Sequence, residues 1–214
     1  IRRQLESSSP AIETFGFAGF FGLPIEFVRL GESAGDWQVP ALIAPQLKVH
    51  EGIESCGQGG DHAAVNRRAQ IRFVRKAWKE FQASAASCFA FVETTGLFYG
   101  FQLLIRSLGF ANSSTSRFDG VAKDDQTRLG PTLDGLCQQG VGLDKQTDMA
   151  ESVLRGIGIT SDFARLVVFC GHGSRTENNP LHAGLDCGAC CGHSGGLNAR
   201  CSANLVNQVE VCAA

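Results

Sequence analysis

The feature that most constrains this chain is an apolar run that ends in a glycine-flanked histidine. Residues 166–170 read Leu-Val-Val-Phe-Cys, and Gly171, His172 and Gly173 follow directly. A short run of bulky and β-branched residues bounded by turn residues predicts a buried strand. This pattern therefore places His172 at the carboxyl end of a strand, where open α/β sheets hold their functional sites.

Cys187 follows in a glycine-rich segment, and a helical pattern begins soon after it, over residues 197–209. The amino terminus of a helix favours negative charge, so a thiol beside it ionises more readily and becomes a better metal ligand. Imidazole and thiolate together suit Zn²⁺, which takes four ligands tetrahedrally. We therefore predict that His172 and Cys187 form half of a zinc site, with their side chains within about 7 Å of each other.

The same segment supports a rival interpretation. Cys187 and Cys190 are spaced as Cys-x-x-Cys, with Cys191 and His193 close behind. These four residues are candidates for a structural zinc knuckle, and the two spaced cysteines for a dithiol redox pair. Cys170, inside the expected strand, is interpreted as a buried apolar residue.

Three polar residues between the two proposed ligands are assigned a supporting role. They shape turns or orient the ligands rather than bind metal, and they are Asn178, Asn179 and His182.

Charge and cysteine usage limit the functional classes. The net charge of −2 gives no field that would attract nucleic acid, so no nucleic-acid partner is expected. Nine cysteines are an odd number, and three of them crowd residues 187–191. This usage favours a reducing, cytoplasmic setting over a disulfide framework.

Helical patterns are expected over residues 1–9, 61–86 and 148–155. The second of these is amphipathic and carries a run of basic residues, namely Arg67, Arg68, Arg72, Arg75, Lys76 and Lys79. A solvated helix face is the plain interpretation of that run, and a surface for phosphates or acidic headgroups is the alternative. A short strand is expected over residues 39–43, and an exposed connection over residues 111–140.

Residues 89–108 form the most apolar stretch, and their length of 20 approaches that of a bilayer crossing. Glu93, Gln102 and Arg106 lie within it and would be costly in hydrocarbon. A buried core helix is therefore favoured, and the alternative is a helix that docks on an integral membrane partner.

Three segments together resemble one known family, the inorganic-carbon transporter subunit DabA. They are ETFGFAGFFGLPI at 13–25, SCFAFVE at 87–93, and FCGHGSRTENNPLHAGLDCGACCGHSGGLNAR at 169–200. The resemblance extends over nearly the whole chain. It implies an α/β fold: a β-carbonic-anhydrase-like core with a mostly parallel sheet flanked by helices. Residues 1–214 would then be a single partial domain.

The resemblance also implies a function. A DabA-like protein is a zinc-binding peripheral subunit at the cytoplasmic face of the cell inner membrane. It works with a proton-conducting integral membrane subunit of the DabB type, and the pair accumulates bicarbonate by vectorial hydration of CO₂. In that family the zinc ligands are a Cys and an Asp from a Cys-x-Asp-x-Arg motif plus a His and a Cys. The last two match His172 and Cys187.

The chain departs from the family pattern in one respect. It contains no Cys-x-Asp-x-Arg motif, and Ile1 resembles the residues that follow this motif in the family. We therefore expect the chain to be a fragment that lacks two zinc ligands and is inactive by itself. A non-catalytic zinc-stabilised interaction module and a thiol redox protein remain the alternative functions.

Overall fold

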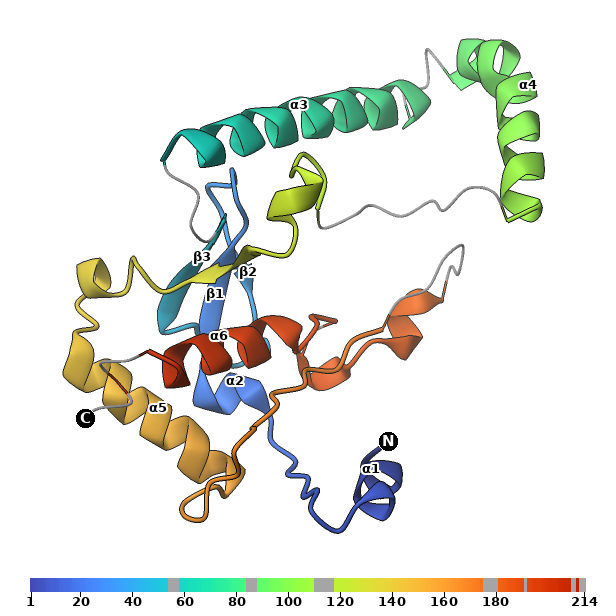
Figure 1. Ribbon diagram of the computed structural model, residues 1–214. Helices are drawn as coiled ribbons and strands as arrows, with labels where there is room; N and C mark the ends of the chain where they lie inside the picture. Colours follow the sequence, from blue (N-terminus) through green and yellow to red (C-terminus); the bar gives the residue numbers. More distant parts are fainter. Residues whose placement is uncertain are drawn as a thin grey trace. The chain divides into compact units, whose positions relative to one another are not determined.

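The computed structural model divides into two compact units (Figure 1). One unit comprises residues 1–52 and 130–214, and the other comprises residues 53–129. The structure describes residues 1–53, 58–83, 88–109, 118–174, 181–190, 192–208 and 211. The single partial domain expected for residues 1–214 stays a prediction.

A four-stranded sheet is the centre of the first unit, with strand order β2-β1-β3-β4. The strands are β1 (Ile25–Val28), β2 (Asp36–Trp37), β3 (Leu47–Ile53) and β4 (Leu129–Thr132). β1 runs parallel to β3, with Ile25 opposite Leu47, and antiparallel to β2. The expected α/β class is confirmed, but the sheet is mixed, so a mostly parallel sheet is not confirmed.

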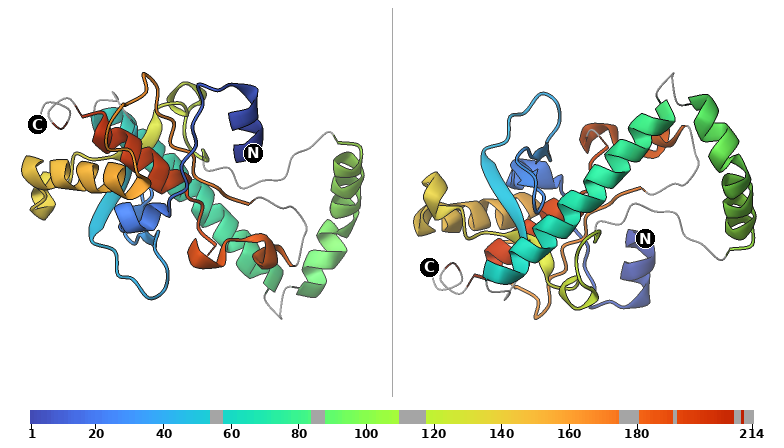
Figure 2. Two further views of the ribbon diagram at one scale, coloured as in Figure 1. Left: turned by 90° about the horizontal axis from the view of Figure 1, so that it is seen from below. Right: turned by 90° about the horizontal axis from the view of Figure 1, so that it is seen from above.

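Helices pack against this sheet and close the core. They are α2 (Gly19–Gly22), α5 (Leu143–Ile157) and α6 (Gly196–Val206), which contact one another in pairs (Figures 1 and 2). α1 (Arg2–Ser8) precedes them and buries none of its residues. Short 3-10 turns occupy Lys123–Asp125, Cys137–Gln139, His182–Leu185 and Gly188–Cys190.

The core of this unit is made by alternate residues of the strands and one face of each helix. Ile25 is fully buried, as are Val153 of α5 and Leu205 of α6. Two buried amides satisfy backbone carbonyls: Asn198 donates to the carbonyl of Leu23 at 2.8 Å, and Gln146 donates to that of Val141 at 2.9 Å. Because buried polar groups are costly without partners, these bonds fix α5 and α6 to specific loops.

The second unit contains two long helices, α3 (Gln58–Ala83) and α4 (Cys88–Ser107). The indole nitrogen of Trp78 on α3 donates to the hydroxyl of Tyr99 on α4 at 3.3 Å. Asp119 accepts hydrogen bonds from two basic residues of α3: its backbone carbonyl from Arg68 at 2.9 Å, and its carboxylate from Arg75. Part of the basic run is therefore engaged within its own unit.

Helix positions are the most accurate part of the sequence prediction. The helices expected over 1–9, 61–86 and 148–155 correspond to α1, α3 and α5, and that over 197–209 corresponds to α6. α5 extends further at both ends than expected, because Gly142 and Gly158 flank it as caps.

Four other expectations are wrong. Residues 166–170 form no strand, and none of the described strands pairs with them. Leu166 is 78% exposed and Val168 is 67% exposed. An apolar run becomes a strand only where a sheet edge accepts its hydrogen bonds, and no described strand offers one to this segment.

The other three errors also concern burial or strand position. The strand expected over 39–43 lies instead at Asp36–Trp37, because Pro40 begins a turn closed by Ile43. The connection over 111–140 contains β4 with its buried Leu129, while residues 110–117 lie outside the described residues. The third concerns α4, which forms as a helix but is exposed: Leu97 is 91% and Phe98 is 83% exposed. Among the described residues, no helix combines the length and apolar character of a membrane span.

Candidate metal centre

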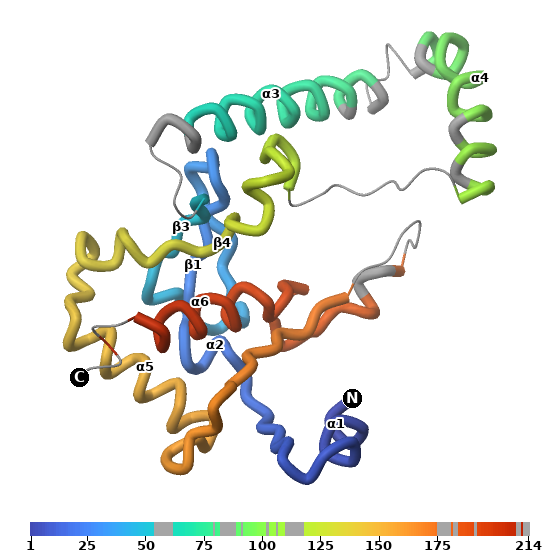
Figure 3. The backbone as a smooth tube through the Cα atoms, viewed as in Figure 1, coloured from blue at the N-terminus to red at the C-terminus, as the bar shows by residue number. Residues whose placement is uncertain are grey.

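His172 lies in an irregular segment whose backbone comes close to Gly195 and Gly196, at the start of α6. Figure 3 traces the path of the backbone. The amide of Gly195 donates to the carbonyl of His172 at 2.8 Å. A Cβ added to Gly171 would lie 2.0 Å from the carbonyl carbon of Gly195 and 2.3 Å from the amide nitrogen of Gly196. Only glycine fits at position 171, because the obstructing atoms are backbone. This crossing of two backbones positions the imidazole.

The cysteines lie in the segment that leads into the same crossing. Cys187 precedes the 3-10 turn Gly188–Cys190, and its carbonyl accepts hydrogen bonds from the amides of Cys190 at 3.2 Å and Gly192 at 3.1 Å. Gly192 adopts a φ of 80°, a conformation that glycine tolerates best. The chain therefore folds tightly around Cys187, and Cys190 returns to the same side of the turn.

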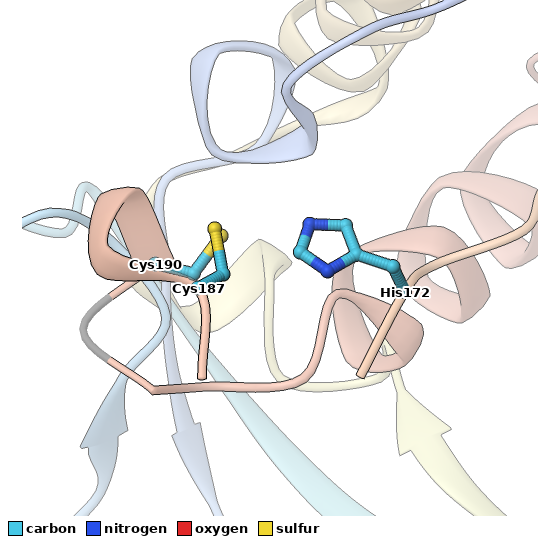
Figure 4. Close-up of side chains that lie close together, drawn as sticks. All are labelled: His172, Cys187 and Cys190. Carbon is cyan, nitrogen blue, oxygen red and sulfur yellow. The ribbon is translucent and has the colours of Figure 1, made fainter. Parts of the chain in front are cut away.

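Three side chains converge where these two segments meet. The ligand atoms of His172, Cys187 and Cys190 all lie within 4.8 Å of one another, and the two sulfurs face the imidazole (Figure 4). His172 is exposed and both cysteines are half-buried. Nitrogen and thiolate sulfur are the ligands that zinc prefers in tetrahedral sites. The donor set therefore fits Zn²⁺, and the expected approach of His172 and Cys187 within about 7 Å is observed.

The surroundings of Cys187 favour its ionised form. The backbone N–H of Cys190 is the main cause of a lowered pKa of the Cys187 thiol, and the Cys190 side chain and the N–H of Ala189 act in the same direction. These donors stabilise a thiolate, which is the form that binds metals. Burial instead raises the pKa of Cys201 on α6 to about 12, so that this thiol stays neutral and inert.

The remaining polar groups nearby are engaged with each other. His193 Nδ1 lies 3.4 Å from Nε2 of Gln38, a buried side chain that follows β2. The hydroxyl of Ser174 donates to the carboxylate of Asp186. His193 is therefore not part of the three-residue group, although the zinc-knuckle interpretation includes it.

Several residues near the site differ from their predicted environment, and others lie outside the described residues. Cys170 is exposed rather than buried, because the segment around it joins no sheet. Asn178, Asn179 and Cys191 lie outside the described residues, as does the side chain of His182. The expected helix amino terminus beside Cys187 is a three-residue 3-10 turn, and α6 begins only at Gly196.

Sequence reasoning assigns Cys190 to the rival site, but its sulfur lies with both His172 and Cys187. The Cys-x-x-Cys spacing is the signal that marks it. What the sequence does not reveal is the crossing at Gly171 and Gly195, which brings the histidine to the same turn.

Comparison with known proteins decides the family. A family model described as "Probable inorganic carbon transporter subunit DabA" matches residues 1–214. The chain belongs to the DabA family. Similar DabA proteins occur in distant bacteria. One from Rhodopirellula baltica is 45% identical over 216 residues. One from Halothiobacillus neapolitanus is 46% identical over 211 residues, and one from Vibrio cholerae is 44% identical over 214 residues.

These DabA relatives are much longer than the chain. The alignments cover 98–99% of the chain but only 24–25% of each of the three relatives. The chain thus spans about a quarter of the length of the curated relatives it matches. No solved structure matches it.

Proposed function

We propose that this chain supplies His172 and Cys187 to the zinc centre of an inorganic carbon transporter subunit that hydrates CO₂ to bicarbonate. The observation that carries the proposal is the approach of these two side chains, from separate segments, to within 4.8 Å. The family name adds the process, inorganic carbon transport. The reaction is the one that the resemblance to DabA implies, through the β-carbonic-anhydrase-like core expected for that family.

The chemistry of the site agrees with this role. A bound zinc ion lowers the pKa of a coordinated water toward ~7, which makes hydration of CO₂ feasible at neutral pH. The chain's own residues prepare the site: backbone N–H groups lower the pKa of the Cys187 thiol, and the hydrogen bond from Gly195 fixes the backbone of His172.

Two ligands do not complete a zinc shell. Zinc takes four ligands, and a catalytic site keeps one position for water. Because the relatives are about four times as long as the chain, residues elsewhere in such a subunit can supply the rest. The chain by itself is accordingly expected to be inactive in hydration.

Substitution of either ligand in a chimeric subunit tests the function. This chain would replace the matching segment of the Halothiobacillus neapolitanus relative, to which it is 46% identical. The host would be a bacterium that lacks carbonic anhydrase and needs bicarbonate uptake to grow in air. We expect His172→Ala and Cys187→Ala each to lower uptake by about 100-fold. Loss of a side chain that binds zinc directly should reduce activity at least as much as loss of the groups that orient such a ligand.

The matched control for this test is Cys170→Ala. Cys170 is an exposed cysteine beside the same crossing that takes no part in the group of three. Uptake should be unchanged in this variant. Normal uptake by the chimera after both His172 and Cys187 are replaced would refute the proposal.

The exposed helix α4 supports a contact with a membrane partner. Its solvent-exposed apolar side chains include Phe89, Val92, Leu97, Phe98, Phe101, Leu103 and Leu104. Large apolar side chains that gather on one exposed helix suit an interaction surface. We propose that α4 docks on a proton-conducting integral membrane subunit, which would hold this subunit peripherally at the cytoplasmic face of the inner membrane.

Charge placed on α4 tests the contact. The double substitution Leu97→Glu and Phe98→Glu should lower co-purification of the chimera with its membrane subunit by about tenfold or more, because buried anchors carry most of an interface's free energy. Leu42→Glu is the control, since Leu42 is 99% exposed and lies in the other unit. Equal recovery of the partner with both variants would exclude α4 as the contact.

A further inference from the structure

We propose that Cys187 and Cys190 are a redox pair, which a hydroperoxide closes to a disulfide and which thereby switches the zinc centre off. The inference rests on the proposed zinc site and adds a covalent modification of one of its ligands. Its basis is the position of the two sulfurs, which lie within 4.8 Å of each other on the same side of the turn (Figure 4).

The zinc centre itself does not need Cys190. The family pattern takes two ligands from His172 and Cys187 and two from a Cys-x-Asp-x-Arg motif, and four ligands complete a tetrahedral zinc site. Cys190 is then a thiol beside a ligand thiol. Cysteines that respond to oxidants commonly lie next to such a second thiol, which resolves the first oxidation product into a disulfide.

The turn that carries both cysteines has the span of a disulfide. The amide of Cys190 donates to the carbonyl of Cys187 at 3.2 Å, so the two residues stand three apart in a 3-10 turn. Side chains at this spacing eclipse each other, and their Cα atoms lie about 6 Å apart. A disulfide joins residues whose Cα atoms are about 4.4–6.8 Å apart. Rotation of the two side chains can therefore close the bond while the backbone turn stays in place.

Both thiols are within reach of a small oxidant. Cys187 and Cys190 are half-buried, whereas Cys201 on α6 is 1% exposed. A Cβ added to Gly188, inside the turn, would meet nothing within 4 Å, so no described group covers the turn at this point. Because oxidation of cysteines follows their exposure, we expect the pair to react and Cys201 to be protected.

The reaction balances with a hydroperoxide as the oxidant. The thiolate of one cysteine attacks the peroxide, so that a sulfur–oxygen bond forms, the oxygen–oxygen bond breaks, and the leaving oxygen takes a proton to give an alcohol or water. The second cysteine then attacks the sulfenic acid, the sulfur–sulfur bond forms, and the other oxygen leaves as water. The two thiols lose two protons and two electrons, and the hydroperoxide accepts both.

Zinc binding and disulfide formation compete for Cys187. Zinc binds the thiolate, and a sulfur in a disulfide no longer supplies one. Oxidation should therefore remove a ligand from the zinc centre, and a dithiol should restore that ligand by thiol–disulfide exchange. Inorganic carbon uptake would accordingly fall under oxidising conditions and recover on reduction.

Peroxide oxidation of the purified 214-residue chain tests the pair independently of transport. The metal-free chain would be treated with hydrogen peroxide, its remaining thiols would be alkylated, and trypsin would release residues 176–200 for mass measurement. This peptide holds Cys187, Cys190 and Cys191, so it should carry one alkyl group instead of three. We expect Cys191→Ser to keep the disulfide and Cys190→Ser to lower its yield by at least about tenfold, because only Cys190 shares the 3-10 turn with Cys187.

Uptake by the chimeric subunit tests the switch. Each variant would be compared with its own untreated cells after a pulse of hydrogen peroxide. The chimera and its Cys191→Ser variant should lose uptake by about tenfold or more and recover it with a dithiol, whereas Cys190→Ser should keep its untreated rate.

The outcomes separate the switch from the zinc centre. Absence of the disulfide, or an equal yield in Cys190→Ser, would overturn the redox pair and leave the zinc ligands untouched. Equal peroxide sensitivity of uptake in Cys190→Ser and the unsubstituted chimera would overturn the switch. The zinc centre is judged by the uptake of His172→Ala and Cys187→Ala without peroxide.

Discussion

Replacing Gly171 with alanine is expected to weaken zinc binding by about 10- to 100-fold, the range typical for groups that hold a metal ligand in place. The added methyl would meet the carbonyl carbon of Gly195 at 2.0 Å and its oxygen at 2.1 Å. Because backbone atoms cannot rotate away, the two segments must separate. Such separation breaks the hydrogen bond from Gly195 to His172 and withdraws the imidazole from the cysteines.

Gly188→Ala is the matched control for this prediction. Gly188 lies in the same glycine-rich region, directly after Cys187, and an added Cβ there would meet nothing within 4 Å. Its zinc affinity, measured by competition with a chromophoric chelator, should equal that of the unsubstituted chain. Similar affinity losses in the Gly171 and Gly188 variants would show that the crossing has no special role.

The helices could be predicted because their signals are local. The recurrence of apolar residues three and four apart over 61–86 and 148–155 reflects a period that a helix carries within itself. Strands depend on partners that are distant in sequence. The run at 166–170 has strand-like composition, but its hydrogen-bonding partner is not encoded in the run. Local composition therefore predicts a strand at 166–170 where the structure has none.

The predicted burial of α4 fails for the same reason, because burial also depends on residues that are distant in the sequence. The composition of α4 indicates burial, yet the structure exposes Leu97 and Phe98. Apolar composition shows that a surface is suited to be covered, and it does not show what covers it.

The candidate site could be predicted in part from residue chemistry. His172 and Cys187 stand out as a nitrogen and a sulfur donor at glycine-rich turns, and their side chains do converge. The sequence places His172 at the end of a strand, whereas the crossing of an irregular segment with the start of α6 positions it. The prediction of the two ligands holds despite this difference, because a zinc site depends on the ligand atoms and their distances and not on the secondary structure that carries them.

Leu205→Ala is expected to lower the free energy of unfolding by about 2–5 kcal/mol, the usual cost of a cavity left by a buried leucine. Leu205 is 1% exposed and belongs to the core that joins α6 to α5 and the sheet. α6 also begins at the crossing that holds His172, so weaker packing of α6 should loosen the site before the whole unit unfolds. Urea unfolding followed by circular dichroism measures the first effect, and zinc affinity in dilute urea measures the second.

Leu42→Ala removes the same atoms from a side chain that is 99% exposed, and it should change stability by less than about 0.5 kcal/mol. If both leucine variants unfolded at the same urea concentration, Leu205 would not be the core residue that its burial indicates.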